Sequence, residues 1–319
     1  MEKVSAIVIQ EHGDPAAVAH CGQIELPPPA AGETRVRVAF SPVNPADINV
    51  LEGKYPVRPE LPGVPGVEGA GILENGTHVL LPHRFGAWRE AGNAPEAALV
   101  HVPAGVPLEQ AAMLRINPAT ALCMLREFVS LAPGDWVIQN AANSAVGRCI
   151  IQLARHHGWR TINVVRRADI IPELTAAGAD AVLIEGATLT ADIHAITGKN
   201  GARIALNAVG GDSATRIAGA LAPGGTIVTY GAMSRQPLRI PNGLLIFQDI
   251  AWRGFWVTRW YERATPAQRA ALFAELFDLA ARGILHTPIE AIYPLTAIAT
   301  ALEHAQRPLR SGKIILRCS

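Results

Sequence analysis

The sequence predicts an α/β protein that combines a doubly wound parallel sheet with a discontinuous, mostly antiparallel β domain. From about Asn117, short apolar strands alternate with helical patterns of 10 to 15 residues, which is typical of parallel βαβ units. The first 113 residues or so are rich in Pro and Gly and contain alternating runs such as residues 34–40. The chain then ends on a helix and a strand, which we expect to return to the first domain.

These observations place the β domain at residues 1–115 and 259–319 and the parallel-sheet domain at residues 116–258. A turn is expected at Pro27–Gly32 and a last strand at Ser311–Arg317. A long helix begins at Thr265, with Pro266 and Gln268 completing a capping box, and Gly283 ends it. The expected strands of the parallel sheet are Trp136–Asn140, Arg160–Val165, Ala181–Ile184, Ala202–Asn207 and Thr226–Tyr230.

The composition argues against several classes of protein. A net charge of +1 gives no general attraction to nucleic acid or to anionic membranes. The four cysteines are scattered without a CxxC pair, which fits a reducing compartment. The first residues, Met1–Ile9, lack the features of a signal or transit peptide, and no apolar run is long enough to span a bilayer. We therefore expect a cytoplasmic enzyme.

Residues 136–147 predict a strand, a tight turn and a helix that bind phosphate. The three positions of the usual glycine fingerprint hold Ala142, Ser144 and Gly147, so the motif alone is a weak match. Two further features of this segment strengthen the prediction that it binds phosphate. Asn143 and Ser144 can donate hydrogen bonds to phosphate, and the backbone N–H groups of Ala145 and Val146 open the helix. The alternative is an ordinary βα turn.

Arg166 and Arg167 indicate which dinucleotide binds. They follow the second expected strand, and Arg166 lies 19 residues beyond Gly147, where an NAD-binding protein carries an acid. A guanidinium there matches a ribose 2′-phosphate instead. The pair therefore favours NADPH and hydride-transfer chemistry, and the alternative is a solvated basic loop.

No metal site is expected. A catalytic zinc in a dehydrogenase of this architecture needs Cys, His and acidic ligands. The candidate loop Gly63–Gly69 carries Val67 where such enzymes have a ligating His, and the loop Asn44–Asn49 has no Cys. The adjacent His156 and His157 fit a solvated helix face.

Without a metal, reduction of a polarised double bond needs a positioned proton donor. Tyr55 is the best candidate, because it is the only tyrosine before residue 230 and follows a turn at Gly53. The alternative is an amphipathic surface tyrosine. The aromatic segment at residues 253–260 could wall a nicotinamide or acyl pocket, or form core packing or a subunit interface. Lys313 could reach a cofactor phosphate or ribose, or be an exposed lysine.

With these residues in view, the chain resembles the zinc-free branch of the medium-chain dehydrogenase/reductase superfamily, and within it the 2-enoyl thioester (trans-2-enoyl-CoA) reductases. The resemblance runs over nearly the whole length, and residues 139–144 and 161–166 are specific to this branch. The segments that carry it are Pro42–Asn49, Gly53–Pro56, Leu61–Gly69, Asn117–Ala121, Pro133–Gly147, Arg160–Arg166, Gly225–Gly231 and Gly254–Trp256.

The resemblance implies a Rossmann-type nucleotide domain, a GroES-like substrate and catalytic domain, and a role for each matching residue. The family's catalytic tyrosine falls on Tyr55. Its cofactor contacts fall on Asn117, Asn143, Ser144, Ala145, Val146, Arg166, Arg167, Tyr230, Gly231, Ala232, Met233, Phe255, Trp256, Val257, Thr258 and Lys313. Three features depart from the family: Ala145 replaces a usual Gly, Arg167 stands where an acid is frequent, and the loop at residues 71–79 is short.

The function implied is NADPH-dependent, zinc-independent reduction of the 2,3-double bond of a trans-2-enoyl thioester of CoA or acyl-carrier protein. The resemblance also implies a homodimer, and a strand near residues 250–257 could form its contact. Two alternatives stay open from the residues. One is an NADPH:quinone or enone oxidoreductase of the same fold. The other is a non-catalytic nucleotide-binding protein, because fold alone does not determine function.

Overall fold

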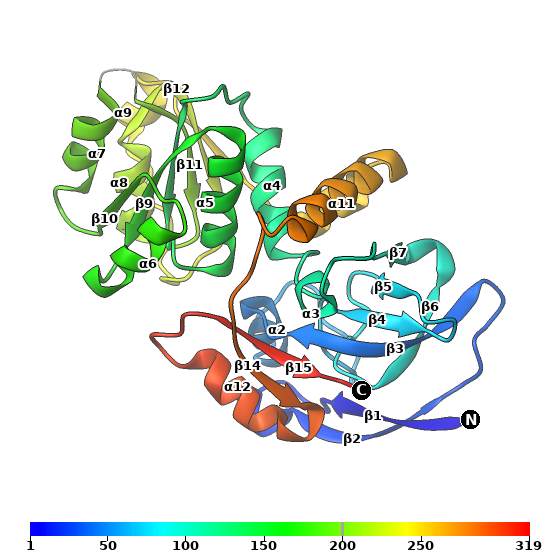
Figure 1. The fold of residues 1–319 in the computed structure, drawn as a ribbon. Helices are drawn as coiled ribbons and strands as arrows, with labels where there is room; N and C mark the ends of the chain where they lie inside the picture. The colour runs from blue at the N-terminus through cyan, green and yellow to red at the C-terminus, as the bar shows by residue number, and fades with distance from the viewer. Residues whose placement is uncertain (199–200) are drawn as a thin grey trace. The chain divides into compact units, whose positions relative to one another are not determined.

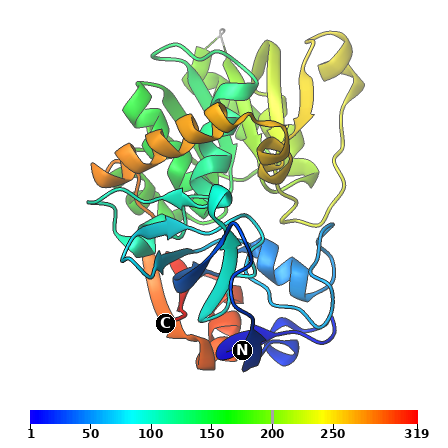
Figure 2. The ribbon, with the colours of Figure 1, turned by 90° about the vertical axis from the view of Figure 1, so that its right-hand side faces the viewer.

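The computed structural model describes residues 1–198 and 201–319. Their contacts divide the chain into two compact units, which we call unit 1 (Met1–Ile116 and Pro266–Ser319) and unit 2 (Asn117–Thr265). Both ends of the chain lie in unit 1 (Figures 1 and 2). The first boundary lies one residue later than the sequence predicts, and the second lies seven residues later. Trp260 attaches residues 257–263 to the rest of unit 2, because its indole N–H donates to Glu127 at 2.9 Å.

Unit 1 is a β domain built mainly from antiparallel strands. Its seven-stranded sheet has the order β14-β15-β3-β4-β5-β7, with β6 paired to β3, and β1 and β2 form a separate pair. Only β14 and β15 pair in parallel among the described strands of this unit. The strands are β1 (Glu2–Val8), β2 (His20–Leu26), β3 (Glu33–Pro42), β4 (Ala70–Leu73), β5 (His78–Leu80), β6 (Ala91–Pro95), β7 (Val100–His101), β14 (Ile289–Pro294) and β15 (Lys313–Arg317).

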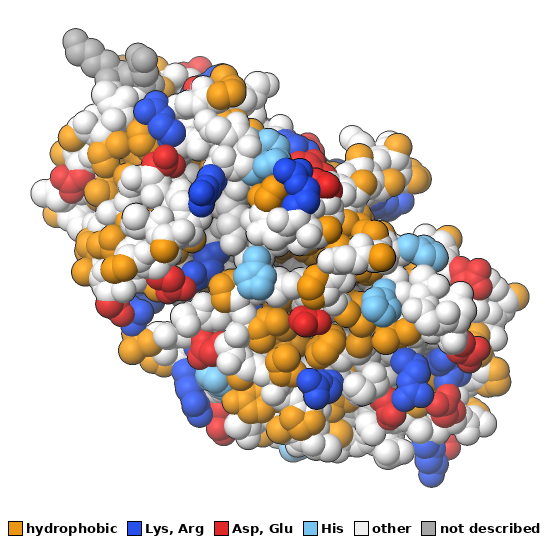
Figure 3. Space-filling view, viewed as in Figure 1, with side chains coloured by type: hydrophobic (Ala, Val, Ile, Leu, Met, Phe, Trp, Pro, Cys, Tyr) orange, Lys and Arg blue, Asp and Glu red, His pale blue; other side chains and the backbone are white. Residues whose placement is uncertain are grey.

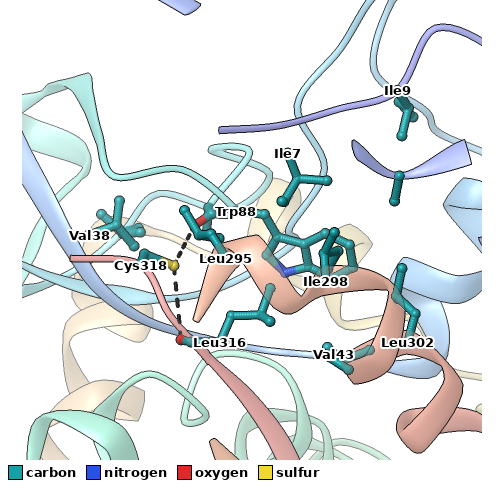
Figure 4. Close-up of a cluster of buried hydrophobic side chains, with 14 of the residues drawn as sticks. Ile7, Ile9, Val38, Val43, Trp88, Leu295, Ile298, Leu302, Leu316 and Cys318 are labelled. Atoms are coloured by element: carbon teal, nitrogen blue, oxygen red, sulfur yellow. Dashed lines mark hydrogen bonds between the residues drawn. The ribbon is translucent and has the colours of Figure 1, made fainter. Parts of the chain in front are cut away.

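Five α-helices belong to unit 1, counted over its described residues: α1 (Pro15–Val18), α2 (Pro45–Leu51), α3 (Leu108–Ala111), α11 (Pro266–Ala281) and α12 (Ile298–Gln306). The expected long helix is α11, and Gly283 follows it with a φ of 67°, which confirms the glycine stop. The core packs around the fully buried Trp88 (Figure 4). The thiol of Cys318 in this core donates to the Ala87 carbonyl at 3.6 Å.

Unit 2 contains the predicted doubly wound sheet. Its six strands are parallel and have the order β10-β9-β8-β11-β12-β13 (Figure 1). Because parallel crossovers are right-handed, the reversal of strand order between β8 and β11 puts α5 and α6 on one face and α7 and α8 on the other. The elements are α4 (Asn117–Glu127), β8 (Trp136–Asn140), α5 (Ala145–His157), β9 (Arg160–Val165), α6 (Ile171–Ala176), β10 (Ala181–Ile184), α7 (Leu189–Thr197), β11 (Ala202–Asn207), α8 (Gly211–Ala218), β12 (Leu221–Thr229), α9 (Asn242–Ile246), β13 (Ala251–Gly254) and α10 (Val257–Arg263).

Four of the five expected strands, β8 to β11, have the predicted bounds, whereas β12 starts five residues earlier, at Leu221. Strand β13 is a short, largely exposed edge strand at residues 251–254, and it lies within residues 250–257, where a strand was expected as a possible dimer contact. The helices between the strands are also shorter than expected. Helix α6 has 6 residues and α8 has 8, while only α5, with 13, falls in the expected range among the helices that connect β8 to β12.

The distribution of charged side chains agrees with the net charge of +1. Positive and negative side chains are interspersed over the face shown in Figure 3. Among the described residues, none of the helices is both long and apolar enough to cross a membrane.

Candidate active site

The carboxyl ends of β8 and β11 form the point in unit 2 at which strand order reverses, where open α/β sheets bind ligands. Asn140 and Asn207 end these two strands, and both side chains are buried. The Asn140 side-chain amide donates to the side-chain oxygen of Asn207 at 2.9 Å, and the side-chain oxygen of Asn140 accepts the Ala208 N–H at 2.7 Å. The two asparagines therefore fix the spacing of the strand ends.

This pair extends into a polar network under the same edge of the sheet. The Asn140 amide also donates to Ser213 at 3.0 Å, and Asn207 donates to Thr229 at 3.1 Å. The Ser213 hydroxyl donates to Glu185, which also pairs with Arg216 at 2.9 Å. None of these residues was predicted from the sequence. The signal was present, because an uncharged polar residue that ends an apolar strand marks this edge.

The phosphate turn has the geometry of an anion site at the start of α5. Ser144 is the N-cap residue and its hydroxyl accepts the Gly147 N–H at 3.1 Å. The N–H groups of Ala145 and Val146 lie in the first turn, where the helix itself offers no acceptor. A Cβ on Gly147 would lie 2.4 Å from the Ala142 carbonyl, so only glycine permits this approach of helix to strand.

Arg166 and Arg167 lie directly beyond the end of β9, the strand next to β8. Arg166 is exposed, while Arg167 is partly buried and pairs with Asp169 at 3.2 Å. Two guanidinium groups beside the phosphate turn suit a dinucleotide with a 2′-phosphate, which is the fit expected of NADPH. The Asp169 carboxylate would compete with a 2′-phosphate for Arg167. Asp169 was not predicted from the sequence as a site residue.

Residues 230–233 follow β12 and bond back to the end of β11. The Tyr230 N–H donates to the Asn207 carbonyl at 3.0 Å, and the Met233 N–H donates to the Ala208 carbonyl at 2.9 Å. Burial raises the pKa of the Tyr230 hydroxyl above its usual range, and a hydrogen bond with Ser144 offsets part of that rise. The segment that holds Gly231 and Ala232 is therefore fixed beside the phosphate turn.

The aromatic segment 255–258 follows β13 and begins α10. The Phe255 N–H donates to the Thr229 carbonyl at 2.9 Å, and its ring meets Phe128 edge-on with centroids 6.1 Å apart. Trp256 is the N-cap residue of α10, and Val257 and Thr258 are buried. Asn117, also buried, is the first residue of α4.

Fifteen of the predicted cofactor residues thus belong to unit 2, and all except Asn117 follow the carboxyl ends of its parallel strands. The two remaining predicted site residues, Tyr55 and Lys313, belong to unit 1.

Tyr55 stands at the end of a short turn that follows α2. Gly53 has a φ of 72°, and a Cβ there would lie 3.0 Å from the Cβ of His12. The N–H groups of Lys54 and Tyr55 both donate to the Asn49 carbonyl, at 2.8 and 3.0 Å. The backbone of Tyr55 is therefore fixed by the C-terminal end of α2.

The N-terminal end of α2 is held by a buried group of four side chains that we call the ionic cluster: Asn44, Asp47, Glu68 and Lys313. The Lys313 ammonium donates to the Asn44 side-chain oxygen, and the Asn44 amide donates to Glu68 at 2.8 Å. Asp47 accepts the N–H groups of Asn44 at 2.8 Å and of Val67 at 3.0 Å. Glu68 also accepts the Ile116 N–H at 2.9 Å.

Burial raises the pKa of Asp47 to about 6 and that of Glu68 to about 7, although the nearby Lys313 ammonium lowers both. Lys313 is only 6% exposed, so the alternative of an exposed lysine is wrong. Its role as a cofactor contact stays a prediction. Asn44, Asp47 and Glu68 were not identified as site residues, because nothing in the sequence brings residues 44 and 313 together.

The loop Gly63–Gly69, which carries Val67 in place of a zinc-ligating His, is attached to α2. The Val67 N–H donates to the Asp47 carboxylate, so the loop is bonded to α2. Within residues 1–198 and 201–319, no group of three or more His, Cys, Asp or Glu side chains is arranged to hold a metal ion.

This chain is similar to several known proteins. The family model described as zinc-binding dehydrogenase matches residues 145–274. The human mitochondrial enoyl-[acyl-carrier-protein] reductase is 41% identical over 330 residues, which cover 98% of this chain and 88% of the relative.

Solved structures match along the full length. A putative NADPH:quinone reductase from Bacillus thuringiensis has a TM-score of 0.93 at 26% identity and covers 100% of both chains. Etr1p, which forms a mitochondrial 2-enoyl thioester reductase heterodimer with Etr2p in Candida tropicalis, has been solved with NADP and crotonyl-CoA. That complex has a TM-score of 0.90 at 28% identity and covers 99% of this chain and 100% of the other. The predicted fold class and family resemblance are confirmed.

The prediction of a cytoplasmic enzyme is contradicted by these relatives. Those from human, Xenopus tropicalis and Arabidopsis thaliana are all named as mitochondrial enzymes. The prediction was wrong because the composition of a folded reductase does not depend on the compartment in which it works.

Proposed function

The chain belongs to the enoyl thioester reductase family of the medium-chain dehydrogenase/reductase superfamily, and we propose that it reduces the 2,3-double bond of trans-2-enoyl thioesters with NADPH and without zinc. The observation that carries this proposal is the identity to an enoyl-[acyl-carrier-protein] reductase along nearly the whole chain. The neighbouring complex with NADP and crotonyl-CoA supports the same cofactor and substrate class.

In this proposal unit 2 is the nucleotide domain. Residues 143–146 hold the pyrophosphate, Arg166 and Arg167 hold the 2′-phosphate, and residues 230–233, 255–258 and Asn117 orient the nicotinamide half. NADPH, when bound, supplies the hydride that adds to the β-carbon of the enoyl group. The protein's contribution is to hold that cofactor in one orientation.

Unit 1 is the substrate and catalytic domain. We propose that Tyr55 donates a hydrogen bond to the thioester carbonyl or a proton to the α-carbon, because negative charge develops there when hydride adds to the β-carbon. The added hydride and proton together saturate the double bond and leave NADP⁺. The short loop at residues 71–79 is the segment in which we expect the acyl preference of this chain to differ from its relatives.

We also propose a homodimer. Strand β13 is an edge of the parallel sheet, and Ile246 and Phe247, shortly before it, are 69% and 85% exposed. Light scattering after gel filtration should give twice the chain mass of 33.8 kDa. A mass of one chain at micromolar concentration would reject the dimer.

The proposed reaction is tested by NADPH oxidation with crotonyl-CoA. The rate should be compared with that for 1,4-benzoquinone, because the neighbour described as a putative NADPH:quinone reductase supports that second candidate. Preferred turnover of crotonyl-CoA supports the thioester reductase. Preferred turnover of benzoquinone supports the quinone reductase, and NADPH binding without turnover of either supports a non-catalytic protein. Comparing crotonyl-CoA with a crotonyl carrier protein then identifies the thioester carrier.

Tyr55→Phe tests the role of the tyrosine. Loss of a general acid costs about 10²- to 10⁴-fold in rate, so kcat should fall by at least about a hundredfold with little change in NADPH affinity. Tyr293→Phe is the matched control, because Tyr293 bonds to His304 at 2.9 Å in the same unit. Full activity of Tyr55→Phe would reject the proposed proton donor.

A further inference from the structure

Arg148 is a buried arginine in the helix that starts at the phosphate turn. It lies in α5, four residues beyond the N-cap Ser144, and is 6% exposed. Arginine is almost never fully buried unless it is paired. The position has no assigned role in the reaction, and neither the glycine fingerprint nor the arginine pair includes it.

The contacts of Arg148 connect two separate segments. Its Nε donates to the carbonyl of Asn143 at 3.2 Å, and a terminal nitrogen pairs with the Glu173 carboxylate at 2.6 Å. Asn143 is part of the phosphate turn, whereas Glu173 lies in the first turn of α6. The other terminal nitrogen has no hydrogen-bond partner within the described residues.

Helix α6 comes directly after the segment expected to bind the 2′-phosphate. Arg166 and Arg167 follow the end of β9, the short 3₁₀ turn Ala168–Ile170 comes next, and α6 begins at Ile171. That turn is itself tied back to the arginines by the ion pair of Asp169 with Arg167. One buried side chain therefore joins the turn expected to hold the pyrophosphate to the segment that carries the arginine pair.

We propose that Arg148 is a positioning residue for selection of NADPH over NADH. By bonding Asn143 and Glu173 together, it fixes the spacing between the phosphate turn and the arginine pair. A cofactor with a 2′-phosphate must engage both places at once, whereas NADH engages only the turn. A preset spacing lowers the ordering cost of binding for NADPH alone. This inference rests on the proposed use of NADPH.

The charges support positioning rather than direct attraction. Glu173 neutralises Arg148, so the pair adds little net positive charge to the phosphate site. The Arg148 side chain is 8% exposed and that of Glu173 is 40% exposed. Solvent and salt therefore reach the carboxylate of the pair but not the guanidinium. An interaction of this kind orients its neighbours, and its loss allows them to move.

The test is the affinity of Arg148→Gln for each cofactor, measured by calorimetry without substrate. We expect the Kd for NADPH to rise about tenfold, equivalent to about 1.4 kcal/mol, while the Kd for NADH changes less than about twofold. At saturating NADPH, kcat should stay within about twofold of wild type. Arg155→Gln, at the exposed C-terminal end of the same helix, is the matched control and should change neither affinity.

Two further variants distinguish a positioning role of Arg148 from a purely structural role and from direct attraction of the phosphate. Glu173→Gln should reproduce most of the loss in NADPH affinity, because it breaks the same connection, and Arg148→Lys should restore part of it. Equal weakening of NADPH and NADH by Arg148→Gln would reject the proposal in favour of the structural role. Tighter NADPH binding by Glu173→Gln would also reject it, because Arg148 would then act as a direct charge.

Cofactor affinity and substrate turnover are separate properties of the protein and can be measured independently. If wild-type protein binds NADPH but reduces no enoyl thioester, the reaction fails and the inference can still be tested. If wild-type protein binds NADH as well as NADPH, both fail together. If Arg148→Gln does not fold, as judged by circular dichroism, Arg148→Lys and Glu173→Gln provide the same comparison.

Discussion

Two buried polar groups shape the two halves of this molecule, and they differ in charge. In unit 2, Asn140, Asn207 and Ser213 join strand ends through amides and a hydroxyl, and we call this group the amide cluster. In unit 1, the ionic cluster holds the N-terminal end of α2 through two carboxylates and an ammonium. The amides carry no charge at any pH of interest, whereas each carboxylate gains or loses one.

Because only the ionic cluster contains carboxylates, we expect it, and not the amide cluster, to make the free energy of unfolding depend on pH. The folded-state pKa values of Asp47 and Glu68, about 6 and about 7, lie above the values of about 4 for unfolded carboxyl groups. Between about pH 4 and pH 7 the folded protein therefore binds more protons at these two groups than the unfolded chain does. Their contribution to stability is therefore greatest below about pH 4, falls as pH rises, and reaches its minimum above about pH 7.

The largest expected effect is that of Lys313→Met, which leaves two buried carboxylates without their cation. Removing one partner from a buried ionic group costs about 3–5 kcal/mol, so we expect that loss in the free energy of unfolding at pH 8. At pH 5.5 the loss should be smaller, because the carboxylates take up protons. Denaturant titrations at both pH values measure it, with the exposed Lys3→Met as control. An equal loss at both pH values would contradict the ionic cluster.

The next effect concerns binding, in unit 2. Arg166→Ala combined with Arg167→Ala should weaken NADPH binding by about 2 kcal/mol, roughly 30-fold, because charge-assisted hydrogen bonds are lost. Binding of NADH should be almost unchanged. Arg160→Ala, at the opposite end of the same strand, is the control. Equal losses for both cofactors would show that the arginines do not contact a 2′-phosphate.

Asn140→Ala sharpens the contrast between the two clusters. It leaves the Asn207 oxygen and the Ala208 N–H without one partner each, which should cost about 1–2 kcal/mol of unfolding free energy. Because no titrating group is removed, the loss should be the same at pH 5.5 and pH 8. A loss that varied with pH would mean that the amide cluster is coupled to a charge such as Glu185.

The smallest effect is expected for Asp169→Asn. It releases Arg167 from a partly exposed ion pair, and such pairs are worth about 0.2–1 kcal/mol. NADPH binding should therefore tighten about twofold, with no change for NADH. Asp278→Asn, which breaks a similar exposed pair with Arg282 in unit 1, is the control. Weaker NADPH binding would show that Asp169 orients Arg167 rather than competing for it.

The same two regions show what the sequence could predict. The phosphate turn was predictable because strand, turn and helix are contiguous, and β8 to β11 are apolar runs with clear ends. The ionic cluster was not, because Lys313 meets Asn44 across 269 positions of sequence. A lysine at the start of a strand resembles a solvated one. Only the folded pairing of β15 with β3 brings Lys313 to Asn44, the N-cap residue of α2. The role of Arg148 was hidden for the same reason, because its partner is on another helix.

Hydride transfer from NADPH to an enoyl thioester is the activity on which the roles of both units depend. Its most direct measurement is the initial rate of crotonyl-CoA reduction by wild-type protein, followed at the nicotinamide absorbance with each reduced cofactor in turn. We predict steady turnover with NADPH and at least about tenfold lower kcat/KM with NADH, the equivalent of about 1.4 kcal/mol. An unchanged absorbance, or equal rates with the two cofactors, would contradict it.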